Sequence, residues 1–163
     1  MAVWQYNVFF IPFINFDENY LEFIKQPDTE FLKNTECFWN NSFINKNEIE
    51  LRIDNFISYY KIVENDSIYW KGYTSDFEDN DCSIVFDNEK NINYFNFRFD
   101  LRNEINIIKS IDLITKIAKE YQLILMNTNY IFFEAETDLL KNEIRNSNGF
   151  KFLENPENFF DHL

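Results

Sequence analysis

The chain has 163 residues and a formal net charge of −13, because 28 acidic side chains outnumber 15 basic ones. A field of that sign repels nucleic acids and anionic lipid, which bind through clustered Lys and Arg, so we expect neither as a partner. The length favours a single domain over residues 1–163, and a hydrophobic fraction of 45% argues against a disordered chain.

Three further features predict a cytoplasmic protein. No run of residues reaches the roughly 18 apolar positions that span a bilayer. The apolar start Met1–Phe16 has no basic residues and no small-residue cleavage site, so it does not resemble a signal peptide. Cys37 and Cys82 lie far apart without a CxxC pattern, which favours free thiols in a reducing compartment over a disulfide.

The first third of the chain is predicted to contain one strand and two helices. Val3–Phe13 alternates and then becomes apolar on both faces, as in a central strand, and Pro12 ends it. A short helix is expected over residues 17–25. Asn45 resembles the N-cap of a second helix. Leu51 lies outside the apolar stripe of this helix, so a strand over part of the segment is the alternative. The stripe consists of Ile49, Ile53, Phe56, Ile57 and Tyr60.

The middle of the chain is predicted to form three strands, Ser67–Tyr73, Cys82–Phe86 and Ile92–Arg102. In the last of them, apolar residues line one face and polar residues the other, which is the period-2 pattern of a half-buried antiparallel hairpin. On the polar face Asp100 lies between Arg98 and Arg102, and we expect it to pair with basic neighbours across or along the strands.

The longest predicted helix is Glu104–Tyr121, because isoleucines recur there at helical spacing in one continuous stripe. Short strands at Leu123–Met126 and Ile131–Glu134 follow. A last helix is expected to be capped by Thr137 and terminated by Gly149. Strands gathered before a helix predict an α+β fold: an antiparallel sheet with one long amphipathic helix packed on it and shorter peripheral helices.

The residue inventory argues against an enzyme and against a cofactor. The chain has one histidine, His162, and it lies next to the C-terminal residue of the sequence. Loops that cradle phosphate need several glycines, and Gly72 and Gly149 are the only two. Too few Cys and His residues are present for a zinc site. We therefore expect no catalytic residues, no metal and no cofactor.

The segment Asp76–Asp81 is the most acidic in the chain. Its spacing to Asp87 resembles a calcium loop in part, but a glycine and a bidentate glutamate are missing, so a solvated loop is the favoured interpretation. Aromatic residues among charges often anchor interfaces, and the segment therefore predicts a contact surface for a basic protein. The predicted partner-binding residues are Tyr73, Asp76, Phe77, Glu78, Asp79 and Asp81.

The order of several short motifs resembles a known class of proteins. These motifs are Trp4-Gln5-Tyr6, Phe38-Trp39, Tyr69-Trp70-Lys71-Gly72, Phe97-Arg98-Phe99-Asp100-Leu101-Arg102, Ile117-Ala118-Lys119 and Phe150-Lys151-Phe152-Leu153-Glu154-Asn155-Pro156. Together they make most of the chain similar to the small acidic bacterial immunity proteins of polymorphic toxin systems. A Trp-Gly pair expected from that class is replaced here by Trp70-Lys71-Gly72.

The resemblance implies a cytoplasmic inhibitor that binds a cognate toxin domain, for which a basic nuclease is the natural partner, and blocks it without catalysis. It carries over no contact residue, because such families vary their binding surfaces. Two alternatives remain open from the residues alone: a carboxylate-dependent hydrolase, and a structural domain that self-associates through its aromatic residues. The oligomeric state is not predicted.

Overall fold

The computed structural model describes residues 4–13, 38–39, 42–73 and 77–156. Within these residues seven strands form one antiparallel sheet in the order β2-β3-β4-β5-β1-β6-β7. The strands are β1 Gln5–Pro12, β2 Tyr60–Val63, β3 Ser67–Tyr73, β4 Glu78–Phe86, β5 Ile92–Asp100, β6 Leu123–Asn127 and β7 Phe132–Phe133. The predicted α+β class with an antiparallel sheet is confirmed.

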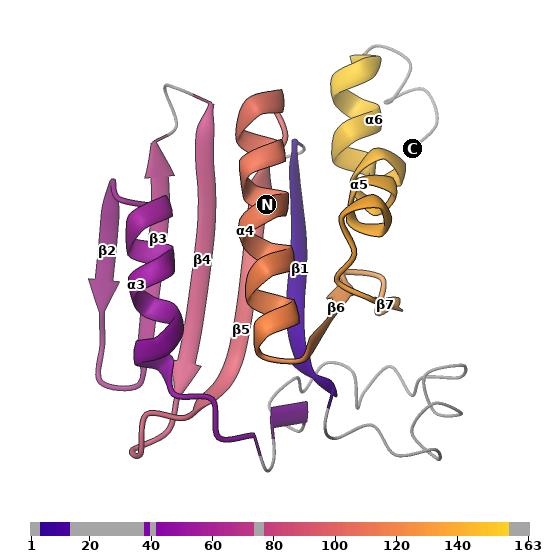
Figure 1. The fold of residues 1–163 in the computed structure, drawn as a ribbon. Coiled ribbons are helices and arrows are strands. Elements are labelled where there is room, and N and C mark those ends of the chain that lie inside the picture. Colours follow the sequence, from indigo (N-terminus) through magenta and orange to yellow (C-terminus); the bar gives the residue numbers. More distant parts are fainter. Residues whose placement is uncertain (1–3, 14–37, 40–41, 74–76, 157–163) are drawn as a thin grey trace.

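Four described helices accompany the sheet: α3 Lys46–Phe56, α4 Glu104–Glu120, α5 Thr137–Asn146 and α6 Asn148–Glu154. Figure 1 shows α3 and α4 side by side on the same face of the sheet, with α5 and α6 beyond β1. Helix α5 packs on α4, and α6 contacts β1. Among the described residues no helix is long and apolar enough to cross a membrane.

Helix α4 forms where the sequence predicts it. The side chain of Asn103 accepts a hydrogen bond from the backbone N–H of Asn106 and so caps the first turn. The predicted isoleucine stripe is buried at Ile111, Ile114 and Ile117 against β5 and β6. This is the long amphipathic helix on the sheet that the periodicity indicates.

The sheet has an inner face toward α3 and α4 and an outer face on the opposite side. Trp70 identifies the inner face, because its indole N–H donates to Asp54 of α3 over 2.6 Å. The same face carries Phe97, which lies opposite Val8 of β1 and contacts Phe56 of α3. The outer face carries the alternate residues, which are mostly polar: Asn7, Lys71, Asp81, Ser83, Asn96 and Arg98.

Several predicted boundaries are wrong in ways that matter for function. Helix α3 ends at Phe56, so Tyr60 belongs to β2 and not to the helical stripe. Strand β4 begins at Glu78, four residues before its predicted start at Cys82. Gly149 lies inside α6, and Glu136, not Thr137, is the N-cap of α5. The helix expected over residues 17–25 lies outside the described residues, as do Cys37 and His162.

Candidate partner-binding surface

A cluster of large exposed apolar side chains lies along β2 and the neighbouring strand β3. Six residues form it: Tyr59, Tyr60, Ile62, Val63, Tyr69 and Tyr73, with exposed fractions between 39% and 63%. We call this group the tyrosine edge, because β2 is an edge strand of the sheet. Isolated exposed apolar residues are ordinary on protein surfaces, but a contiguous group is typical of an interaction site.

The strand register explains why these residues gather. Tyr60 lies opposite Lys71, and Ile62 lies opposite Tyr69, so all four side chains project from the outer face. The ring of Tyr59 contacts that of Tyr73 edge-on, with centroids 4.6 Å apart. Val63 lies opposite Ile68 and projects from the inner face, and Tyr59 and Tyr73 line a smaller hollow beside Phe56 of α3, so the group occupies both sides of the sheet edge.

A groove of about 440 Å³ lies on the outer face beside the tyrosine edge. Tyr60, Ile62 and Tyr69 contribute apolar lining, and Asn96 and Arg98 of β5 contribute polar lining. Burial lowers the pKa of Arg98, and Asp79 opposes that shift, yet a guanidinium remains charged at neutral pH. The guanidinium forms an ion pair with Asp81 across the two strands.

The predicted acidic loop is only partly a surface loop. Asp79 is 8% exposed, and its Oδ1 lies 2.8 Å from Lys71 Nζ in a contact that lacks hydrogen-bond alignment. Asp81 also contacts Lys71, over 3.3 Å, in addition to Arg98. Both carboxylates are thus neutralised inside the protein. The loop prediction is wrong for residues 78–81 because they begin β4.

The remaining predicted contact residues differ in their placement. Tyr73 is 41% exposed and belongs to the tyrosine edge, and it lies opposite the exposed Glu78 in the register. Phe77 is 51% exposed and has a φ of 56°. Asp76 lies outside the described residues. Tyr73 and Glu78 therefore continue the tyrosine edge to the start of β4, where Phe77 precedes the strand, and their role in binding stays a prediction.

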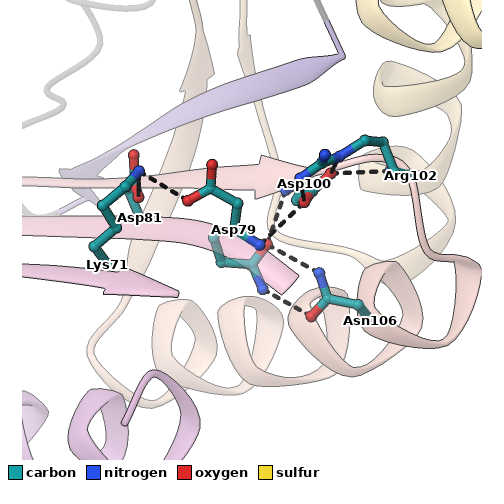
Figure 2. A network of polar contacts seen from close by, with 7 residues as sticks. Lys71, Asp79, Asp81, Asp100, Arg102 and Asn106 are labelled. Atoms are coloured by element: carbon teal, nitrogen blue, oxygen red, sulfur yellow. Dashed lines mark hydrogen bonds and ion pairs between the residues drawn. The ribbon is translucent and has the colours of Figure 1, made fainter. Parts of the chain in front are cut away.

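A buried polar network fixes this end of the sheet (Figure 2). Asp100 is fully buried and accepts hydrogen bonds from Arg102 Nε at 2.8 Å and Arg102 Nη2 at 2.6 Å. It also accepts from the backbone N–H of Asp79 at 3.0 Å. Burial acts to raise the pKa of Asp100, but these hydrogen bonds outweigh it and hold the pKa below its ordinary value. The expected pairing of Asp100 therefore involves Arg102, whereas Arg98 pairs with Asp81.

Arg102 also contacts Phe77, the aromatic residue of the predicted contact segment. Its guanidinium lies 4.9 Å from the ring centres of both Trp4 and Phe77. Asn80 links the same region to α4, because its amide donates to Asn106 Oδ1 over 2.8 Å. The exposed ring of Phe77 thus rests on a rigid base, as an interface anchor requires.

The described residues contain no group of three or more Cys, His, Asp or Glu side chains that would hold a metal ion. The calcium loop considered from the sequence is incompatible with β4. Glu78 begins this strand and Asp87 follows its last residue, so nine steps of about 3.3 Å along an extended backbone separate them by about 30 Å. Cys82 is buried, and burial raises the pKa of its thiol well above the ordinary value.

Two carboxylates do share one described hollow, of about 390 Å³, beside β6. These are Glu134 and Glu136, and the side chain of Glu136 is 54% exposed and pairs with Lys119 at 2.9 Å. Both carboxylates are exposed to solvent, whereas the general acid of a hydrolase commonly lies in a desolvated site. The hollow gives the hydrolase alternative little support.

Comparison of the chain with protein-family models, curated proteins and solved structures gave no match in any of the three searches. The surface must therefore be interpreted from its own geometry. Sequence reasoning assigned Tyr60 to a helix and so missed the edge strand, although the run Tyr-Lys-Ile-Val at residues 60–63 has the β-branched and aromatic composition of a strand.

Proposed function

We propose that this chain is a cytoplasmic binding protein that inhibits a basic toxin domain by occupying its surface, in the manner of an immunity protein. The observation that carries the proposal is the tyrosine edge. Six large apolar side chains remain exposed there, five of them on the adjacent strands β2 and β3 and one, Tyr59, directly before β2. Tyrosine is enriched at binding hot spots, because it buries a large ring and keeps a polar hydroxyl for the rim.

The conformation of β2 favours recognition of a protein over a small molecule. An edge strand presents unpaired backbone N–H and C=O groups, which a partner can bind together with the side chains. Natural edges are commonly blocked by a lysine that projects outward. Here Lys61 instead turns to the inner face, where its Nζ lies 2.7 Å from Glu50 and 2.8 Å from Asp54.

The charge distribution favours a basic partner. Lys61 and Lys71, the two lysines of the β2–β3 pair, are both engaged by carboxylates of the protein itself. Glu64 and Asp66 are exposed in the turn between β2 and β3, and Glu78 is exposed beyond Tyr73. Together with the net charge of −13, these carboxylates attract a cationic surface toward the tyrosine edge.

Inhibition by binding alone requires no catalytic group. A partner surface of standard size covers about 800 Å² on each protein, which is enough to obstruct an active site. The rigid sheet beneath the tyrosine edge keeps the free and bound conformations similar, which limits the entropy cost of binding. The resemblance to immunity proteins is consistent with this mechanism and supplies the class of partner.

The first experiment identifies the partner and then maps the contact. A tagged chain is used to capture proteins from the native lysate, and washes at low and high salt are compared. A basic toxin domain encoded beside this chain is the expected partner, and the affinity for the purified domain is then measured by calorimetry. Capture of no basic protein, together with no inhibition of the neighbouring toxin, would contradict the proposal.

The contact is mapped with a matched pair of variants. The double variant Tyr60→Ser, Tyr69→Ser removes two rings of the tyrosine edge and should weaken binding by at least about 30-fold, the effect of one hot-spot residue. The control Ile105→Ser, Ile108→Ser removes two side chains of similar exposure, 65% and 53%, from helix α4. An equal loss of affinity in both double variants would exclude the tyrosine edge as the contact.

Self-association through β2 is the competing use of the same surface. Two copies pairing their β2 strands would bury the same tyrosines without any toxin. Analytical ultracentrifugation of the chain alone distinguishes the two. A monomer at high concentration favours the inhibitor, whereas a dimer abolished by Tyr60→Ser, Tyr69→Ser favours a structural domain.

A further inference from the structure

A second cavity, of about 480 Å³, lies beside β1 and β6. These strands are at the other end of the strand order from β2 and β3, which carry the tyrosine edge. The cavity opens where β6 stops: the pairing of β6 with β1 ends at Val8 and Asn127, so the first residues of β1 continue beyond it. The turn after β6 and the junction between α5 and α6 form the other walls. Its described lining consists of Gln5, Tyr6, Asn7, Asn127, Thr128, Asn129, Ile131, Glu143, Asn146, Ser147, Asn148 and Gly149.

Tyr6 contributes a buried hydroxyl to this region. Tyr6 is only 7% exposed, and its Oη has no hydrogen-bond partner in the described part of the chain. Burial, together with the nearby Glu143, raises the pKa of Tyr6, so the hydroxyl stays protonated. A buried hydroxyl without a partner is unusual in a stable core, because its loss of water is not compensated, and it indicates a missing partner.

Glu143 is the single carboxylate of the described lining, and no Lys or Arg is among those residues. Its Oε2 accepts a hydrogen bond of 2.8 Å from the amide of Asn127. Asn127 is itself held in place, because its Oδ1 accepts from the backbone N–H groups of Asn129 and Ile131. The carboxylate of Glu143 is therefore oriented by a rigid turn, and none of the described lining residues is a Lys or Arg that would neutralise it.

We propose that this cavity binds an ammonium or guanidinium group, with Glu143 as the anionic partner and Tyr6 Oη as an additional acceptor. The remaining lining supports a cation, since most of its side chains are amides or hydroxyls whose oxygens accept hydrogen bonds. An anion would face the carboxylate without compensation, and an apolar ligand would leave the amides unpaired. The site is separate from the tyrosine edge, so it does not depend on the proposed inhibitor function.

The cation has two sources with the same chemistry: a free amine, or an Arg or Lys side chain of another protein. Two probes distinguish them in ¹H–¹⁵N spectra of the full chain. Agmatine represents the free amine, the peptide acetyl-Gly-Arg-Gly-amide represents a side chain, and glutarate serves as the anionic control. Shifts confined to the signals of Asn127, Asn129 and Glu143 are expected with one or both cations and not with glutarate.

Two variants test the assigned groups. Glu143→Gln keeps an oxygen for Asn127 and should weaken cation binding by about tenfold or more through loss of the charge. Tyr6→Phe removes only the unpaired hydroxyl; it should weaken binding a few-fold while leaving the melting temperature equal or higher. A charge-matched control is Asp138→Asn, which lies on the same helix α5 but outside the cavity lining, and its affinity should not change.

The outcomes separate the proposal from its alternatives. Agmatine alone, the peptide alone or both binding at these residues supports a cation site and identifies the source. No shift at Asn127 or Glu143 with either probe at about 10 mM, a concentration that detects dissociation constants up to roughly that value, overturns the proposal. Equal binding by Glu143→Gln and the unmodified chain overturns it as well.

Discussion

Replacement of Asp100 by asparagine tests whether the buried ion pair with Arg102 holds β4, β5 and α4 together. The carboxylate accepts four hydrogen bonds: from Asp79 N, and from Arg102 N, Nε and Nη2. Asparagine preserves the shape, but it loses the charge and directs an NH₂ group toward one of these donors. Breaking one side of a buried pair costs about 3–5 kcal/mol, because the remaining charge is left uncompensated.

That cost should depend on pH in a defined direction. The hydrogen bonds from Arg102 and Asp79 outweigh burial and lower the pKa of Asp100 in the folded protein. A group with a lowered folded pKa stabilises the protein above its unfolded pKa, which is about 3.9 for Asp, and loses this contribution as the pH falls through the folded value. The difference between the unmodified chain and Asp100→Asn should therefore be constant between about pH 5 and 7 and shrink below about pH 4.

Urea unfolding followed by circular dichroism at several pH values measures both effects. Proteins of this size are commonly stable by about 5–15 kcal/mol, so a loss of about 3–5 kcal/mol in Asp100→Asn at neutral pH is a large fraction of the total and easily measured. The control is Asp112→Asn, whose side chain is 62% exposed and pairs with Lys116 at 2.7 Å; it should change stability by less than about 0.5 kcal/mol. Equal effects of the two variants at neutral pH, or a difference that persists unchanged in acid, would refute the reasoning.

Two further predictions concern the strand pair beneath the tyrosine edge and the approach of the partner. In Gly72→Ala the new Cβ would lie 1.9 Å from the backbone oxygen of Glu78, so β3 and β4 must separate. Denaturant unfolding should show that the free energy of unfolding falls by about 1–3 kcal/mol or more. An unchanged free energy of unfolding would contradict the close approach of the two strands. The described carboxylates nearest the groove are paired within the protein, so they should attract a basic partner at long range without forming ion pairs with it. Surface plasmon resonance should therefore show that added salt lowers the association rate and leaves the dissociation rate nearly constant. A dissociation rate that rises steeply with salt would instead place ion pairs at the contact.

The sequence predicts the elements in which local pattern and burial agree. Strand β5 and helix α4 were predicted within two residues of their observed ends, because a period of two and a period of 3.6 are unambiguous over nine or more residues. Strand β3 has its predicted bounds. The α+β class follows from these elements alone.

Tertiary pairing overrides the local signals elsewhere. The polar start of β4, Glu78 to Asp81, has the composition of a loop, yet it is a strand because Lys71 and Arg98 on the neighbouring strands neutralise its carboxylates. Those partners lie 8 to 20 residues away in sequence, so no local window contains the information. The same limit applies to Tyr60, whose spacing to Ile53 and Phe56 fits a helix that in fact ends first.

The location of the proposed binding surface depends on strand order more than on composition. An acidic and aromatic segment directs attention to residues 76–81, but its aspartates Asp79 and Asp81 are engaged with Lys71 and Arg98, which removes them as free contacts. Tyr60 and Ile62 of β2 are exposed because they project from the outer face of a strand that no further described strand flanks. Tyr69 of β3 projects from the same face and is 42% exposed. We infer that the net charge of −13 favours a basic partner and that strand order determines where such a partner would bind.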